Sequence, residues 1–152
     1  MSRLHVVEIL DTMWGDEPGE APPFFKINPR NHSGRRLYNL IGEDASLLVT
    51  DSCRELVTSP KDHGKPDPEW LRQNLEHLES LRHIDLLLVC GAVAKKTYGR
   101  CCFLPSSQTR IIEMPHPAAR LVWTRDLIEK LKAEIAASRQ PLTANASEGG
   151  LP

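Results

Sequence analysis

The stretch DLLLVC, residues 85–90, decides the fold. It is a continuous apolar run, which is typical of a central strand in a parallel sheet covered on both faces. The run LHVVEIL at residues 4–10 predicts the first strand of the same sheet. Neighbouring parallel strands are joined by crossover segments, which place helices on both faces of the sheet.

The remaining elements follow from apolar spacing and helix-capping residues. Two more strands are predicted at residues 46–50 and around residues 111–112. Ser33 is predicted to cap one helix and Asp67 another, because Ser and Asp side chains accept hydrogen bonds from free N–H groups at helix starts. The apolar stripe of the second helix is expected to run as far as Leu81. Further helices are predicted over residues 92–98 and 127–135.

Strand and helix therefore alternate about four times, which predicts an α/β domain with a mainly parallel four-stranded sheet and helices on both faces. The chain has 152 residues, 40% hydrophobic residues and a net charge of −1, as expected for one domain. We assign residues 1–139 to this domain and residues 140–152 to a flexible tail.

Several classes of protein do not fit the sequence. There is no apolar run of membrane-spanning length and no signal-peptide pattern, so a cytoplasmic monomer without membrane contact is expected. Four cysteines occur without a CxxC pair, which disfavours a metal site. No Gly-rich phosphate loop or nicotinamide fingerprint is present, so no cofactor is expected.

Polar residues and a glycine each lie just past a predicted strand: Asp11, Asp51, Gly91 and His116. Ligands of open parallel sheets bind beyond the carboxyl ends of the strands. Two acids and a histidine are therefore predicted to share one crevice. His116 lies between two prolines, which stiffen its loop. The alternative is a surface histidine in an ordinary proline turn.

Taken in order, these segments resemble the uracil-DNA glycosylase superfamily over residues 4–137. Met114-Pro115-His116-Pro117 is similar to the closing His-Pro motif of that family, with Ala118 in place of the usual serine. The resemblance implies a uracil-DNA glycosylase-like fold. It also implies hydrolysis of the N-glycosidic bond of an unusual pyrimidine in DNA, which leaves an abasic site. There the histidine contacts O2 of the departing base.

The resemblance implies a water-activating residue for which two candidates remain open. Asp11 follows the first strand, where the family carries this acid or amide, but the family's Gly-containing loop ending in Pro is not preserved. Asn28-Pro29 resembles an asparagine–proline version of the motif, so Asn28 is the rival. Residues 19–22, GEAP, resemble a third version but do not follow a strand directly.

Three residues are candidates for holding the base. The family places an aromatic residue where Phe24 and Phe25 occur, and one of the two is expected to stack on the base while the other packs in the core. Asp51 stands where many relatives have asparagine. Because an ionised aspartate only accepts hydrogen bonds, it suits the amino group of cytosine, whereas a protonated Asp51 could read uracil.

Recognition of a cytosine-like base by Asp51 would have a biological consequence. Ordinary cytosine must be spared, which favours a modified cytosine as substrate. Some relatives remove modified cytosines from phage DNA, so the resemblance also suggests a role in antiviral defence.

The DNA itself requires contacts to its phosphates. We predict such contacts for Arg30, Arg35, Lys61, Lys65 and Arg120. Arg36 lies in the same basic cluster, and the alternative is a mixed, solvated surface. Two other functions stay open: a protein of the same fold that binds DNA without cutting it, and a hydrolase of free nucleosides.

Overall fold

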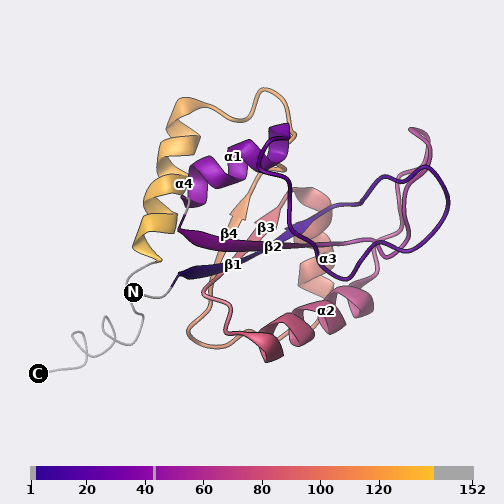
Figure 1. Cartoon of the computed structure of the whole chain (residues 1–152), viewed down its shortest axis with the longest axis horizontal. Helices are drawn as coiled ribbons and strands as arrows, with labels where there is room; N and C mark the ends of the chain where they lie inside the picture. Colours follow the sequence, from indigo (N-terminus) through magenta and orange to yellow (C-terminus); the bar gives the residue numbers. More distant parts are fainter. Residues whose placement is uncertain (1–2, 43, 139–152) are drawn as a thin grey trace, which may run out of the picture.

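Four strands and four helices alternate along residues 3–42 and 44–138, the part of the chain that the computed structural model describes (Figure 1). The elements are β1 (Leu4–Leu10), α1 (His32–Ile41), β2 (Ala45–Asp51), α2 (Pro68–Leu81), β3 (Leu86–Cys90), α3 (Ala92–Arg100), β4 (Arg110–Met114) and α4 (Arg125–Ala137). The predicted tail, residues 140–152, lies outside the described residues.

All strand pairs of the sheet are parallel, and the strand order is β2-β1-β3-β4. This arrangement confirms the predicted α/β class. The chain winds from β1 outward to β2 and then returns past β1 to β3, so the direction of winding changes between β1 and β3. A change of this kind opens a crevice at the carboxyl ends of the two strands.

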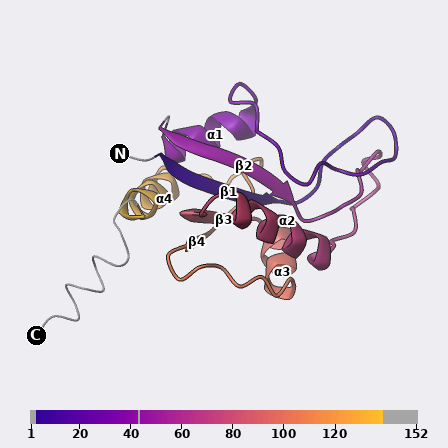
Figure 2. The ribbon, with the colours of Figure 1, turned by 60° about the horizontal axis from the view of Figure 1, so that its bottom comes forward.

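The helices form a layer on each face of the sheet. Figures 1 and 2 show α1 and α4 on one face and α2 and α3 on the other. Each layer packs on its own core cluster, and the apolar side chains of β1 and β3 contribute to both. Every residue of β1 and β3 is buried, as expected for central strands that are covered on both sides.

The helix starts confirm one predicted cap and correct the other. Asp67 Oδ1 accepts a hydrogen bond from Trp70 N–H at 3.0 Å, as predicted. The cap of α1 is Asn31, not Ser33, because Asn31 Oδ1 accepts from Gly34 N–H at 2.6 Å. A Cβ on Gly34 would lie only 1.9 Å from the Asn28 carbonyl oxygen, so a tight turn brings the chain into the helix at Asn31.

The core of α2 ends one turn earlier than predicted. Leu78 is 1% exposed, whereas Leu81 is 63% exposed. Leu81 is the last residue of the helix and lies beyond the part that packs on the sheet. Its apolar spacing alone could not reveal this, because the spacing continues to the helix end.

Three observations bear on the protein classes considered above. Cys53, Cys90, Cys101 and Cys102 are all free thiols. No helix among the described residues is both long and apolar enough to cross a membrane. Within residues 3–42 and 44–138, no three His, Cys, Asp or Glu side chains are grouped so as to hold a metal ion.

Candidate functional site

The carboxyl ends of the strands are joined by hydrogen bonds, which fixes the residues that follow them. Ser52 N–H donates to the carbonyl oxygens of Leu10 (3.1 Å) and Asp11 (3.0 Å), and Ser52 Oγ donates to Leu10 O at 2.5 Å. At the carboxyl ends of β3 and β4, Gly91 N–H donates to Met114 O at 2.8 Å. The segments that carry Asp11, Asp51, Gly91 and His116 therefore leave the sheet at one edge.

Asp51 is a buried carboxyl group with an unsatisfied oxygen. Its residue is 1% exposed, and Oδ2 has no hydrogen-bond partner among the described residues. Burial, with a smaller contribution from the charge of Asp11, raises the pKa of Asp51 to about 7. Both protonation states of Asp51 are therefore present at neutral pH.

Asp11 and His116 influence each other's ionisation. Burial raises the pKa of Asp11, and the charge of His116 opposes this shift. Burial lowers the pKa of His116, and the charge of Asp11 opposes that shift in turn. Since Asp11 also affects Asp51, the structure brings the three predicted side chains into one electrostatically coupled group.

The hydrogen bonds of His116 determine where its ring carries a proton. Ala118 N–H donates to His116 Nδ1 at 3.0 Å, so the proton of the neutral ring is on Nε2. Gly91 has a φ of 92°, and a Cβ there would lie 3.2 Å from His116 Cβ. Glycine at this position therefore lets the histidine pack closely against the start of α3.

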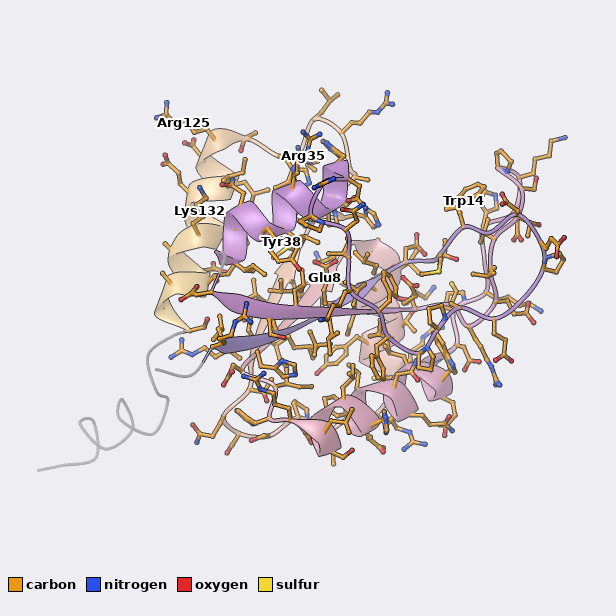
Figure 3. All side chains as sticks on the ribbon, in the orientation of Figure 1. Glu8, Trp14, Arg35, Tyr38, Arg125 and Lys132 are labelled. Atoms are coloured by element: carbon orange, nitrogen blue, oxygen red, sulfur yellow. The ribbon has the colours of Figure 1, made fainter. Side chains whose placement is uncertain are left out.

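Sequence reasoning missed a third acid, Glu8, in the middle of β1. Glu8 is 0% exposed and lies on the side of the sheet that α1 covers (Figure 3). Neither carboxyl oxygen has a conventional hydrogen-bond partner among the described residues, and the nearby Cys90 thiol is a weak donor. Burial raises the pKa of Glu8 well above its usual range, and the charge of Asp51 adds to this effect.

The two phenylalanines lie on opposite faces of the sheet. Phe25 exchanges backbone hydrogen bonds with Val49 of β2 (2.9 and 2.8 Å) and packs against the core under α1 and α4. Phe24 packs against the other core and stacks on His77, with ring centroids 5.9 Å apart. Because side chains alternate along a strand, Phe25 shares a face with Val49 and Asp51.

Asn28, the rival water-activating residue, is exposed and takes part in the turn before α1. Its Oδ1 accepts a hydrogen bond from Arg30 N–H at 2.9 Å, and its carbonyl oxygen accepts from Asn31 N–H at 3.3 Å. No described contact links its side chain to Asp11 or His116. The turn accounts for Asn28 without a role in the site.

Two of the five residues predicted to contact phosphates, Lys61 and Lys65, lie on an arm beyond the sheet. The arm consists of residues 12–20 and 53–66 (Figure 1), and one of its cross-links is Gly15 N–H to Val57 O at 3.0 Å. Its acidic residues are Asp16, Glu17, Glu20, Glu55 and Asp62, and its basic residues are Arg54, Lys61 and Lys65. The arm is thus acidic on balance. The GEAP segment begins at the end of this arm, where Glu20 forms an ion pair with Arg54 at 3.0 Å.

The other three, Arg30, Arg35 and Arg120, belong to a different surface, here called the basic face. It is built from residues 21–42 and 114–125, which contain several arginines but no aspartate or glutamate. The two segments are in contact, since Arg36 Nη1 donates to Pro117 O at 2.7 Å. Figure 3 shows Arg35 and Arg125 on this side of the molecule, whereas Trp14 lies on the arm.

An exposed leucine lies in the loop between His116 and α4, and it was not singled out from the sequence. Leu121 is 100% exposed and has a φ of 65°, a backbone conformation that bulky residues seldom adopt. Strained residues of this kind are concentrated at functional sites. Apolar spacing could not have distinguished Leu121 from a core position.

Comparison with known protein families and with curated proteins finds no significant match to this chain. The fold and the candidate site define an α/β protein in which Asp11, Asp51 and a neutral His116 lie beyond the carboxyl ends of a parallel sheet, beside the basic face.

Proposed function

We propose that the protein is a DNA glycosylase that hydrolyses the N-glycosidic bond of a non-canonical pyrimidine and leaves an abasic site. The observation that carries this proposal is the coupled group of Asp11, Asp51 and His116 next to an acid-free basic face. A modified cytosine is the preferred base, and uracil is the alternative.

The proposed roles of Asp11 and His116 follow from the charges that develop during the reaction. As the bond between C1′ and N1 breaks, the sugar becomes positive and the departing base becomes negative. The Nε2–H of His116 donates to O2 of the base, which acts like an oxyanion hole. The Asp11 carboxylate stabilises the sugar and orients the attacking water.

Asp51 is proposed to select the base by its pattern of donors and acceptors. The amino group of cytosine needs an acceptor, which aspartate offers in both protonation states. O4 of uracil needs a donor, which only the protonated acid offers. Since burial raises the pKa of Asp51 to about 7, uracil recognition should weaken above neutral pH while recognition of the cytosine amino group persists.

When a base is extruded, stacking is lost both by that base and by the duplex that it leaves, and protein groups must replace it. Phe25 shares a face with Asp51 and offers an aromatic surface for the extruded base. Leu121 is fully exposed, five residues after His116. Apolar side chains can insert between base steps of a duplex, and we propose this role for Leu121.

A change in base preference tests the assignment of Asp51. At pH 8, we expect Asp51→Asn to raise the ratio of uracil release to 5-substituted cytosine release about 10- to 10²-fold, because the amide always offers a donor to O4. Single-turnover assays on matched oligonucleotides measure this ratio. Asp62→Asn, an exposed acid on the arm, serves as control. An unchanged ratio in Asp51→Asn would contradict the assigned role.

A second prediction locates the DNA on the basic face rather than on the arm. Each phosphate contact contributes about 0.9 to the slope of log affinity against log salt. We therefore expect Arg35→Ala to reduce the slope by about one, and Lys61→Ala to leave it unchanged. Fluorescence anisotropy of labelled DNA at several salt concentrations measures the slopes, and the reverse pattern would place the DNA along the arm.

A further inference from the structure

Two side chains hold the start of the loop after β4: Arg36 from α1 and Trp123 from the end of the loop itself. The guanidinium of Arg36, on α1, lies over the ring of Trp123 at 4.9 Å from its centroid and donates from Nη1 to Pro117 O at 2.7 Å. Trp123 Nε1–H donates to the carbonyl oxygen of His116 at 2.9 Å. The two consecutive carbonyl groups of His116 and Pro117 are thus each bound by one member of the Arg36–Trp123 pair.

The other hydrogen bonds of this loop are local. Ala119 N–H donates to His116 O at 2.9 Å, and Ala118 N–H donates to His116 Nδ1 at 3.0 Å. These bonds shape the turn, but they do not attach it to the rest of the fold. The contacts of Arg36 and Trp123 connect the turn to α1, which packs on the sheet that also carries Asp11 and Asp51.

We propose that Arg36 and Trp123 are positioning residues that fix the backbone of His116 and Pro117, so that the His116 ring presents Nε2–H to the base. This inference rests on the proposed function. It also separates Arg36 from the phosphate-binding arginines with which the sequence groups it. An arginine whose guanidinium stacks on an indole and binds a carbonyl is already engaged within the protein.

Two conservative variants test this inference. Trp123→Phe keeps an aromatic ring under Arg36 but removes the N–H donor, and Arg36→Lys keeps the charge but removes the planar stacking group. Because small displacements of a reacting group cost up to about 10²-fold in rate, we expect each variant to lower single-turnover base release at saturating protein about 10- to 10²-fold. DNA affinity should stay within twofold of wild type. Trp14→Phe and Arg72→Lys, both remote from the loop, serve as matched controls.

Nitrogen NMR of the His116 ring gives a readout that does not depend on activity. Wild type should show one neutral tautomer, with the proton on Nε2, and Trp123→Phe should show a mixture or broadened signals. Wild-type rates together with an unchanged tautomer in both variants would overturn the inference. If one variant fails to fold, the other decides. If wild type releases no base, the proposed function fails, while the tautomer measurement still tests the positioning role.

Discussion

Replacement of Asp11 or His116 by alanine is expected to abolish most base release while leaving DNA binding intact. Loss of one oxyanion-type donor typically costs about 10²–10³ in rate, which is the effect expected for His116→Ala. Loss of a group that orients and activates water costs about 10²–10⁴, which is the effect expected for Asp11→Ala. The measurement is single-turnover conversion of oligonucleotides to abasic sites, with anisotropy to follow DNA binding.

The pH dependence gives Asp11→Ala a further signature. In the proposed mechanism Asp11 acts as a carboxylate, and burial raises its pKa. The wild-type rate should therefore rise with pH as Asp11 loses its proton, and Asp11→Ala should lose this rise. Burial also lowers the pKa of His116, which favours the neutral ring as the donor.

Asn28→Ala is the matched comparison for Asp11→Ala. The side chain of Asn28 is exposed and engaged with Arg30 N–H, so we expect its loss to change the rate less than a few-fold. A loss of base release in Asn28→Ala but not in Asp11→Ala would assign the role of orienting the water to Asn28. Equal, unmeasurable activity in wild type and in all variants, with DNA binding preserved, would favour a binding protein of the same fold.

The second large effect is on stability and concerns Glu8. The native pKa of this carboxyl is well above the value of 4.5 for an ordinary glutamate, so the native state holds a proton that the unfolded state releases. Its contribution to stability is therefore greatest at acidic pH. It falls by about 1.4 kcal/mol for each pH unit above the unfolded pKa, until the native pKa is reached.

Glu8→Gln removes this titration while keeping the shape of the side chain. We expect the stability of wild type relative to Glu8→Gln to fall as the pH rises above the ordinary glutamate pKa, by up to about 1.4 kcal/mol per pH unit. Urea unfolding at several pH values measures it. Comparing the two proteins cancels the opposite contribution of His5, whose pKa burial lowers. Glu17→Gln, at an exposed position on the arm, is the control, and its stability should change with pH as that of wild type does. If the stability of Glu8→Gln also changes with pH as that of wild type does, the result would contradict a neutral, buried Glu8.

Much of the fold was predictable because the apolar patterns in the sequence coincide with the residues that the core buries. The bounds predicted for β1 match those observed, since every residue of that strand is buried. The cap of α1 was not predictable in the same way. Asn31 and Ser33 are both good capping residues, and only the close approach of Gly34 to Asn28 decides between them.

The site was predictable where it depends on topology and not where it depends on side-chain contacts. Asp11, Asp51 and His116 were expected together because parallel strands end at one edge. The pairing of Arg36 with Trp123 links residues 87 positions apart in a contact that no periodic pattern reveals. Glu8 could have been singled out from the sequence. An acidic residue within an otherwise apolar strand is unusual, because such residues are almost never fully buried unless they are paired.

In the proposed function, Asp11, Asp51 and His116 surround one pyrimidine extruded from DNA. The most direct measurement incubates the wild-type protein with duplexes that each carry one modified pyrimidine, and detects the free base by mass spectrometry. The expected result is a free modified cytosine and an abasic site in equal amounts. Intact bases in every duplex, under conditions in which the protein is folded and bound to the DNA, would contradict it.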